Sequence, residues 1–379
     1  MHLLIIGGGL AGLAAAHTIH RSAAKDDTLT ITVVEPKAYI EVPWATLRAF
    51  FDCRVSETCT MPMSNFLAKH PKVTHIRAKV TSLTKSEVTL DNGQKLSFDV
   101  CLLATGARKS LDILNAYVSA STSDSEEQAL ESRRDALAAT GKNMFAASSI
   151  LIIGGGAIGT ELAADIAGFS AMQNGPKPSV TLVHSGNHLV PELRAKGATK
   201  VLNMVKDMGV KVHLQEKAIE KDGKWFLESS DQPIEADLVI KTTGVYPIND
   251  FMKVGLSHSL DDRGWVKVDD HFRVPGTEGR IFAVGDCCDA LQKTGVNAMG
   301  SKTAVAKNII KTLRALRQNM SPDFLTGLAT KAEGPPVFLI TVGPKKGLAQ
   351  TPFGALTWPL PQLKNRTMFI FRAKMELGL

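Results

Sequence analysis

The amino-acid sequence predicts an α/β fold built from two doubly wound units, and three observations support this prediction. The chain has 379 residues, which exceeds the usual ceiling of about 250–300 residues for a single hydrophobic core. Two glycine-rich segments, beginning at Gly7 and Gly154, each follow an apolar strand and open an alanine-rich helix. Two further apolar strands end in Thr-Gly, at Gly106 and Gly244, in corresponding places of the two halves.

Both glycine-rich segments have the G-x-G-x-x-G spacing of dinucleotide-binding loops. The first glycine permits a tight turn, the second lets the backbone approach a pyrophosphate, and the third allows close packing of helix on strand. The pyrophosphate then lies at a helix N-terminus, where free N–H groups and the helix dipole favour negative charge. The residues expected to line the two loops are Gly7, Gly8, Gly9, Leu10, Ala11 and Gly12, and Gly154, Gly156, Ala157, Ile158 and Gly159.

Two dinucleotide sites on one chain predict an oxidoreductase that transfers electrons between a nicotinamide nucleotide and a flavin. In the first half, Glu35 ends the next strand, where a carboxylate can accept hydrogen bonds from both hydroxyls of an adenosine ribose. In the second half, His184 stands at the corresponding strand end. Because an acid repels a 2′-phosphate and a histidine does not, we expect both NADH and NADPH to be used. A solvated strand-end residue is the alternative at each position.

The order of these segments predicts a discontinuous architecture. We expect the first nucleotide-binding domain at 1–112 and 245–318, the second inserted at 113–244, and a small α+β domain at 319–379. Within them we expect an exposed helix in 119–139, a strand at 266–268 and a helix from about 298 to 317. The final residues predict strand, turn, strand and then a basic, aromatic tail.

The composition limits the kinds of binding partner and the cellular compartment that we expect. The formal net charge of +7 favours anions such as nucleotide phosphates, anionic lipid or nucleic acid, with a solvated basic surface as the alternative. Five cysteines, an odd number without framework spacing, indicate a reducing compartment. No apolar run is long enough to cross a bilayer, so we expect a cytoplasmic protein without a metal site. Its tail is suited to a peripheral membrane contact or, equally, to packing against the first domain.

The ordered motifs resemble those of two-dinucleotide flavoprotein reductases, the FAD- and NAD(P)-dependent pyridine nucleotide oxidoreductases of glutathione-reductase-like, Rossmann-type fold. They are the first loop with its acid, Ala104-Thr105-Gly106, the second loop with Glu161, Thr243-Gly244 and Ala283-Val284-Gly285-Asp286. Within that superfamily the segments at 46–49, 180–185 and 293–310 are most similar to the apoptosis-inducing-factor-like branch that includes the ferroptosis suppressor protein. Type II NADH dehydrogenases are close to this branch.

The resemblance implies FAD in the first unit and NAD(P)H in the second, and it gives roles to individual residues. Arg48 would contact the flavin nucleotide, Val80 would offer backbone to the adenine, and Asp286 would bind the ribityl chain. Glu161 and Lys293 are the catalytic candidates, near the nicotinamide and the substrate pocket. The further cofactor contacts implied are Ala104, Thr105 and Gly106 for FAD and Gly244, His184 and Glu161 for NAD(P)H.

Each of these roles has a structural alternative: an exposed helix residue for Arg48, a helix N-cap for Asp286, an ordinary first-turn acid for Glu161 and a solvated loop lysine for Lys293. The resemblance also implies hydride transfer from NAD(P)H through FAD to a quinone of the ubiquinone, menaquinone or vitamin K class. A soluble acceptor, such as a monodehydroascorbate-like radical or an iron–sulfur protein, is the second hypothesis. A DNA-binding death effector is the third, with little support because no lysine-rich run with interleaved aromatics occurs.

The cysteines do not follow the C-x4-C pattern through which disulfide reductases of this fold pass electrons. Cys53 and Cys59 are separated by five residues, Cys101 is expected in the core, and Cys287 and Cys288 are adjacent. We therefore expect electrons to pass straight from the flavin to the acceptor.

Overall fold

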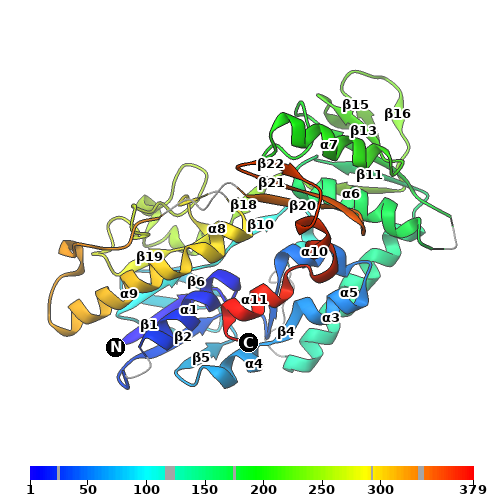
Figure 1. Ribbon diagram of the computed structural model, residues 1–379. Helices are drawn as coiled ribbons and strands as arrows, with labels where there is room; N and C mark the ends of the chain where they lie inside the picture. The colour runs from blue at the N-terminus through cyan, green and yellow to red at the C-terminus, as the bar shows by residue number, and fades with distance from the viewer. Residues whose placement is uncertain (24–25, 116–123, 174–175, 292, 332–336) are drawn as a thin grey trace.

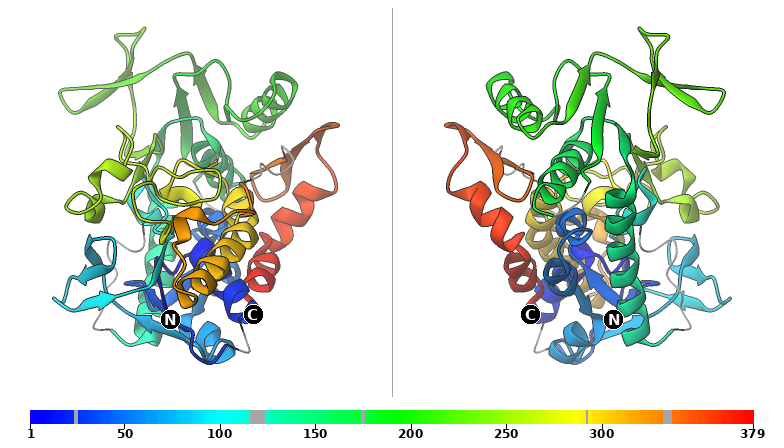
Figure 2. Two further views of the ribbon diagram at one scale, coloured as in Figure 1. Left: turned by 90° about the vertical axis from the view of Figure 1, so that its left-hand side faces the viewer. Right: turned by 90° about the vertical axis from the view of Figure 1, so that its right-hand side faces the viewer.

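The structure is a computed structural model that describes residues 1–23, 26–115, 124–173, 176–291, 293–331 and 337–379. Figure 1 shows two α/β units, one around the blue N-terminal strands and one around the green strands, with the red C-terminal segment between them. The two views of Figure 2 show this segment along one side of the molecule. The predicted fold class is confirmed: two doubly wound units with parallel sheets, completed by a small C-terminal part.

The first unit is built on a five-stranded parallel sheet in the order β19-β9-β1-β2-β5. Its strands are β1 (His2–Ile6), β2 (Thr30–Val34), β5 (Val73–Ile76), β9 (Val100–Leu103) and β19 (Ile281–Ala283). Leu3 and Ile5 pack in the cluster that contains helices α1 (Leu10–Ser22) and α9 (Lys302–Arg317), whereas Leu4 and Ile6 pack on the opposite face. Burial on both faces explains the unbroken apolar run of β1.

Smaller elements surround this sheet. The face that receives Leu4 and Ile6 is covered by an antiparallel meander of β6 (Val80–Leu83), β7 (Glu87–Leu90) and β8 (Lys95–Ser97). The remaining elements of the N-terminal part are β3 (Tyr39–Glu41), β4 (Thr60–Pro62), α2 (Thr46–Ala49), α3 (Cys53–Cys59) and α4 (Met63–Lys69). The described 3₁₀ turns are η1 (Pro43–Ala45), η2 (Asp112–Leu114), η3 (Asp250–Met252), η4 (Ser257–Ser259), η5 (Gly285–Cys287) and η6 (Pro322–Phe324).

The second unit repeats the first around a four-stranded parallel sheet in the order β13-β12-β11-β17. Its elements are β11 (Ser149–Ile153), α6 (Ala157–Ser170), β12 (Ser179–His184), α7 (Ala195–Lys206), β13 (Lys211–Leu214), β14 (Ala218–Lys221), β15 (Lys224–Leu227), β16 (Pro233–Ile234) and β17 (Leu238–Lys241). Gly7 N donates to Val34 O and Gly154 N donates to Val183 O, both at 2.9 Å. Each glycine loop therefore leaves its central strand in the same way.

The two chain crossings between the units lie side by side, as the antiparallel strands β10 (Ala107–Lys109) and β18 (Val245–Pro247). After the first crossing, helix α5 (Glu126–Ala146) packs on the first unit, where Arg133 forms a buried ion pair with Glu41 at 2.8 Å. The helix expected in this region is therefore present, but one of its faces is buried rather than exposed.

The C-terminal segment connects the units. Its antiparallel strands β20 (Phe338–Val342), β21 (Lys346–Thr351) and β22 (Gly354–Leu356) lie against the second unit, and helices α10 (Leu360–Thr367) and α11 (Ile370–Leu377) follow. Helix α11 buries Ile370, Ala373 and Leu377 against α1 of the first unit. The strand–turn–strand prediction holds for β20 and β21. The residues expected to form a basic, aromatic tail instead form a third strand, β22, and the two helices α10 and α11.

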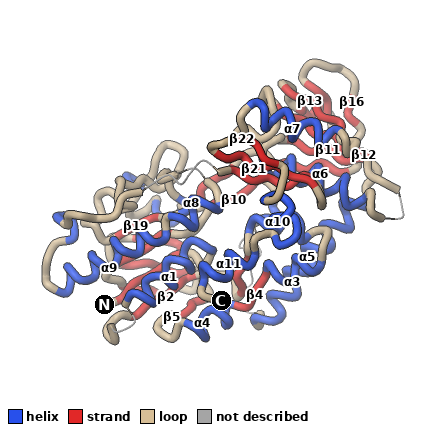
Figure 3. The backbone as a smooth tube through the Cα atoms, viewed as in Figure 1, coloured by secondary structure: helices blue, strands red, loops and turns tan. Residues whose placement is uncertain are grey.

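One expectation from the sequence was wrong, and another was only partly right. Residues 266–268 form no strand, because Val266 makes only isolated bridges, with Leu260 and Cys288, and Figure 3 shows this region as loop. The helix expected at about 298–317 is two helices, α8 (Gly295–Gly300) and α9, which meet at Ser301. Within the described ranges, every helix is too short or too polar to span a lipid bilayer.

Candidate functional site

The first glycine loop joins β1 to α1 and has the backbone that a pyrophosphate requires. Gly7 adopts a φ of +109°, and a Cβ there would lie 2.6 Å from the Ala104 carbonyl carbon. A Cβ on Gly12 would overlap the carbonyl oxygen of Gly7, so only glycine permits this helix–strand contact. A Cβ on Gly9 would meet nothing within 4 Å. The loop thus leaves open space beside Gly9, the N-cap of α1, where a phosphate would lie.

Glu35 directly follows the last residue of β2, beside this loop, close to the strand end that the sequence predicts. Its side chain is 6% exposed, and its Oε2 accepts a hydrogen bond from Gly8 N at 2.8 Å. Its Oε1 accepts a second from Lys37 N at 3.1 Å. Two backbone donors fix the orientation of this buried carboxylate at the carboxyl edge of the sheet. This arrangement fits an adenosine ribose, whose hydroxyls are donors.

The ends of β9, which pairs with β1, and of β19, which pairs with β9, contribute to the same edge. Gly106 follows β9 with a φ of +73°, and Thr105 Oγ1 donates to Asn249 Oδ1 at 3.2 Å. Asp286 follows β19 within η5, where its Oδ2 lies 3.4 Å from Lys109 Nζ. The N-cap alternative for Asp286 is wrong, because Thr294 caps the next helix, α8.

Two other predicted residues lie in different surroundings. Val80 opens β6 and is half-buried, and its contact with the adenine stays a prediction. Lys293 donates to Cys288 O at 2.8 Å and lies 3.9 Å over the ring of the buried Trp265. The ammonium of Lys293 is thereby held on the loop that follows Asp286, so the solvated-lysine alternative is wrong, and its catalytic role stays a prediction.

The second glycine loop repeats the geometry of the first. Gly154 has a φ of +114°, and a Cβ on Gly159 would overlap the carbonyl oxygen of Gly154. Gly156 caps α6, whose first residues are Ala157 and Ile158, and a Cβ on Gly156 would meet nothing within 4 Å. These matching features fit a second pyrophosphate at the N-terminus of α6.

His184 occupies the place that Glu35 occupies in the first unit. Its Nδ1 accepts a hydrogen bond from Gly155 N at 3.1 Å. Because a backbone N–H only donates, Nδ1 carries no proton, and the ring is neutral with its proton on Nε2. Burial, and then the charge of His188, lower the pKa of His184 and favour this neutral form. The site therefore presents neither a carboxylate nor a cation to an adenosine ribose.

The closing strand of the second unit supports its glycine loop. Thr242 Oγ1 donates to Gly154 O at 2.9 Å and to Ile153 O at 3.1 Å. Gly244 then turns the chain into β18 with a φ of +84°, and a Cβ there would lie 2.8 Å from the hydroxyl oxygen of Tyr246.

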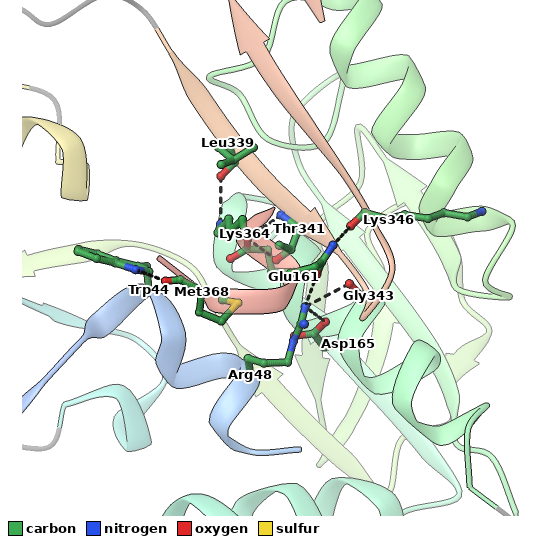
Figure 4. A network of polar contacts seen from close by, with 11 residues as sticks. Trp44, Arg48, Glu161, Asp165, Leu339, Thr341, Gly343, Lys346, Lys364 and Met368 are labelled. Carbon is green, nitrogen blue, oxygen red and sulfur yellow. Dashed lines mark hydrogen bonds and ion pairs between the residues drawn. The ribbon is translucent and has the colours of Figure 1, made fainter. Parts of the chain in front are cut away.

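Glu161 lies on α6 and faces the C-terminal segment (Figure 4). Its Oε1 accepts hydrogen bonds from Thr341 N at 2.9 Å, from Thr341 Oγ1 at 2.8 Å and from Lys364 Nζ at 2.8 Å. Lys364 also donates to Leu339 O at 3.1 Å. Helix α6 begins at Ala157, so Glu161 lies in its second turn and the first-turn alternative is wrong.

Arg48 is 3% exposed, so the exposed-helix alternative is wrong as well. Its guanidinium donates to both oxygens of Asp165 at 3.0 Å, one turn beyond Glu161 on α6. It also donates to Gly343 O at 3.1 Å and to Asn365 Oδ1 at 3.0 Å. Burial raises the pKa of Asp165 to about 6, although Arg48 opposes this shift. The contact between Arg48 and a flavin stays a prediction.

The structure thus joins Glu161 and Arg48 in one buried cluster that the sequence did not reveal, and leaves Lys293 outside it. The cluster pairs Arg48 with Asp165 and Lys364 with Glu161. Figure 4 shows that these residues come from both units and from the C-terminal segment. The sequence could have indicated Asp165, because it lies four residues after Glu161 and therefore on the same face of the predicted helix. Lys364 had none beyond its place among other basic residues.

All five cysteines are free thiols, and Cys101 lies in the core, as the sequence predicts. Cys101, Cys287 and Cys288 are 0% exposed. Cys53 and Cys59 stand at opposite ends of α3. Burial raises the pKa of Cys59 to about 12, which keeps it a thiol.

Comparisons with known proteins agree with this geometry. The family described as pyridine nucleotide-disulphide oxidoreductase matches residues 1–307. The chain is 27% identical over 410 residues to apoptosis-inducing factor homolog B of Dictyostelium discoideum, covering 99% of this chain and 96% of that protein. It is 24% identical over 369 residues to ferroptosis suppressor protein 1 of Homo sapiens, covering 92% and 88%.

Among solved structures, the sulfide:quinone oxidoreductase of the hyperthermophilic bacterium Aquifex aeolicus superposes with a TM-score of 0.73 at 16% identity, covering 99% of this chain and 92% of that one. At this identity the likeness shows the fold. Together with the two matching glycine loops, the family match shows that the chain belongs to the pyridine nucleotide-disulphide oxidoreductases, in their apoptosis-inducing-factor-like branch, and is an oxidoreductase that uses a pyridine nucleotide and a flavin.

Proposed function

We propose that this protein is an FAD-dependent NAD(P)H:quinone oxidoreductase, with FAD in the first unit and NAD(P)H in the second. One observation carries the proposal: two equivalent glycine loops end beside different side chains, the carboxylate of Glu35 and the neutral imidazole of His184. The carboxylate suits the unphosphorylated ribose of FAD. The imidazole accepts a ribose with or without a 2′-phosphate, which favours the use of both nicotinamide nucleotides.

The residues of the first unit suit FAD. The open space beside Gly9 and the N-terminus of α1 would hold the pyrophosphate, and Asp286 would accept hydrogen bonds from ribityl hydroxyls. The flavin supplies the redox chemistry, since it accepts a hydride and passes on its electrons. The protein contributes orientation and electrostatics.

Glu161 is the residue that we assign to the nicotinamide. Thr341 and Lys364 hold its Oε1, whereas no hydrogen bond from a described residue reaches its Oε2. That second oxygen is an acceptor suited to the amide N–H of a carboxamide. With its Oε1 held by Lys364 and Thr341, Glu161 would use this second oxygen to orient the nicotinamide.

A quinone is the proposed acceptor for two reasons. One similar structure is titled a sulfide:quinone oxidoreductase. The segment 337–379 also exposes apolar and basic side chains that suit a lipid-soluble acceptor at a membrane face: Phe353, Leu356, Trp358, Leu360, Leu363, Phe371 and Met375, with Lys345, Lys346, Arg366 and Arg372. We infer a cytoplasmic protein with peripheral contact to a membrane. A soluble acceptor is the alternative.

The cysteines take no part in the proposed electron path, because the adjacent pair at 287 and 288 is fully buried. Replacing both with Ser is expected to leave quinone reduction in place as long as FAD stays bound. We also propose the domain division at 112/113 and 244/245, which the side-by-side crossing strands β10 and β18 support.

The test is an assay of the purified protein. The flavin spectrum is recorded first, and oxidation of NADH and NADPH is then followed with a short-chain ubiquinone, menadione, ferricyanide and oxygen in parallel. We expect a yellow protein whose flavin is bleached by either nucleotide and reoxidised fastest by a quinone. A colourless protein that cannot reduce added FAD would refute the proposal, and reoxidation by soluble acceptors alone would favour the alternative.

A further inference from the structure

A lysine that the sequence motifs do not single out lies at the edge of the first sheet where the ligand is expected. Lys109 ends β10, shortly after β9, and its Nζ lies 3.4 Å from Oδ2 of Asp286. Asp286 follows β19, and β9 and β19 are adjacent in the sheet. Ligands of doubly wound sheets bind at the carboxyl ends of such strands. We propose that Lys109 is a flavin-site residue whose charge offsets that of Asp286 and thereby sets FAD affinity and flavin potential.

The backbone of Lys109 is held firmly. Its N–H donates to Asn115 Oδ1 at 2.8 Å, and its carbonyl accepts from Asn115 Nδ2 at 2.7 Å. Asn115 is 2% exposed, and the β10–β18 pairing adds a further constraint opposite Val245. A buried amide that holds both polar groups of one residue's backbone fixes where its side chain starts, as a binding site requires.

The charges at this edge give Lys109 its role. FAD carries two phosphate charges, and the carboxylates of Glu35 and Asp286 add to the negative potential. Among the described residues, Asp286 has one ion-pair partner, Lys109, and the two side chains are 28% and 23% exposed. The other nearby cation, Lys293, is held by Cys288 O and the Trp265 ring. Without Lys109, an uncompensated carboxylate would face an anionic ligand and an increasingly anionic reduced flavin.

The neighbouring residue provides a matched control. Arg108 lies on the same strand and carries the same charge, but its side chain is exposed and stacks on Tyr246 at 5.7 Å. Successive side chains of a strand point to opposite faces, so Arg108 contributes to the overall charge without contacting Asp286. Comparing the two residues separates a local effect at the flavin site from a general effect of net charge.

The inference rests on the proposed function, and its test measures FAD binding and potential rather than turnover. The variants are Lys109→Gln, Lys109→Met, which keeps the aliphatic stem, Lys109→Arg and Arg108→Gln. The FAD dissociation constant is measured by flavin fluorescence during reconstitution, and the midpoint potential by equilibration with redox dyes. We expect Lys109→Gln and Lys109→Met to weaken FAD binding about tenfold and shift the potential to more negative values. Lys109→Arg should restore both, and Arg108→Gln should change neither.

Equal affinity and potential in wild type and either uncharged variant would overturn the inference, as would equal changes in Arg108→Gln. Its failure is distinguishable from failure of the proposed function, because a wild-type protein that binds no FAD refutes the latter before any variant is compared. A salt titration of the wild type gives an independent check. FAD affinity should fall with ionic strength more steeply in wild type than in Lys109→Met, and equal slopes would contradict the role of the charge.

Discussion

His184 Nδ1 accepts a hydrogen bond from Gly155 N at 3.1 Å, in the place where Glu35 accepts one from Gly8 N at 2.8 Å. In both units a backbone N–H of the glycine loop donates to a side chain at the end of the next strand, but the acceptor is a carboxylate in the first unit and a neutral imidazole in the second. A backbone N–H at a glycine loop needs an acceptor in either case, and either a carboxylate or an unprotonated imidazole nitrogen can supply it. The difference bears on the nucleotide that each unit selects.

We expect the wild type to use NADH and NADPH with kcat/KM values that differ by less than about a hundredfold. Replacing His184 with Glu introduces the acid of the first unit, and its repulsion of a 2′-phosphate should lower kcat/KM for NADPH at least about tenfold relative to NADH. His184→Gln is the control, since it adds no charge and should leave the ratio near that of the wild type. A strict preference of the wild type for NADH would contradict the interpretation.

Glu161 is expected to matter for flavin reduction and not for flavin binding. Glu161→Gln removes the charge that Lys364 and Thr341 hold in place, and Glu161→Ala removes the acceptor altogether. Both should slow reduction of the bound flavin by about a hundredfold or more in stopped-flow experiments, with FAD content unchanged. Glu131→Gln, on the exposed face of α5, should have no effect. Unchanged turnover of Glu161→Ala would rule out the assigned role.

Replacing only one member of the buried ion pair of Arg48 and Asp165 should destabilise the protein strongly. Arg48→Met or Asp165→Asn leaves an unpaired charge and should lower the free energy of unfolding by about 3–5 kcal/mol, measured in urea. The double variant Arg48→Met/Asp165→Leu should lose less than the sum of two single losses. The exposed pair of Lys95 and Glu87 is the comparison, and Lys95→Ala should cost less than about 1 kcal/mol.

Acid should destabilise the protein through His17. Burial, and then the charge of His70, lower the pKa of His17 to about 4, and His17 Nδ1 lies 2.8 Å from His70 Nε2. His70 Nδ1 donates to Phe66 O, so a neutral His70 accepts at Nε2 and His17 donates. This contribution is complete above the unfolded pKa near 6.5 and is lost as pH falls toward 4. Denaturation midpoints should fall over that range.

The matched variants are His17→Gln, which should flatten the dependence of the midpoint on pH, and His258→Gln on the surface, which should not. A pH profile of His17→Gln identical to that of the wild type would contradict the assignment.

The membrane contact can be tested without truncating the C-terminal segment. Phe353 is 100% exposed and Trp358 is 72% exposed, so Phe353→Ser and Trp358→Ser remove apolar contact area without opening the core. We expect weaker co-sedimentation with anionic vesicles and unchanged flavin content. Phe324→Ser is the control, because Phe324 is 85% exposed but lies outside this segment. Equal binding by wild type and both variants would favour the soluble acceptor.

The sequence predicted the features whose causes are local. A buried strand that runs into glycines with positive φ needs particular residues at adjacent positions, so β1, β11 and their loops could be located from the sequence. Segment 266–268 alternates like a strand, but within the described residues Val266 makes only isolated bridges, to Leu260 and Cys288, and strand pairing of this kind depends on distant segments that no local pattern records. Lys364 pairs with a glutamate 203 residues away, and no local pattern records such a contact.

The strand order of the first sheet has a consequence for synthesis of the chain. Its edge strand β19 is separated by 177 intervening residues from β9, its neighbour in the sheet, and α11, late in the chain, covers α1. When the N-terminal part of the first unit has left the ribosome, its sheet still lacks β19, so the first unit cannot yet complete its fold. The inserted second unit, whose four strands are consecutive in the chain apart from a small side sheet, can assemble earlier. The domain begun first is therefore completed last.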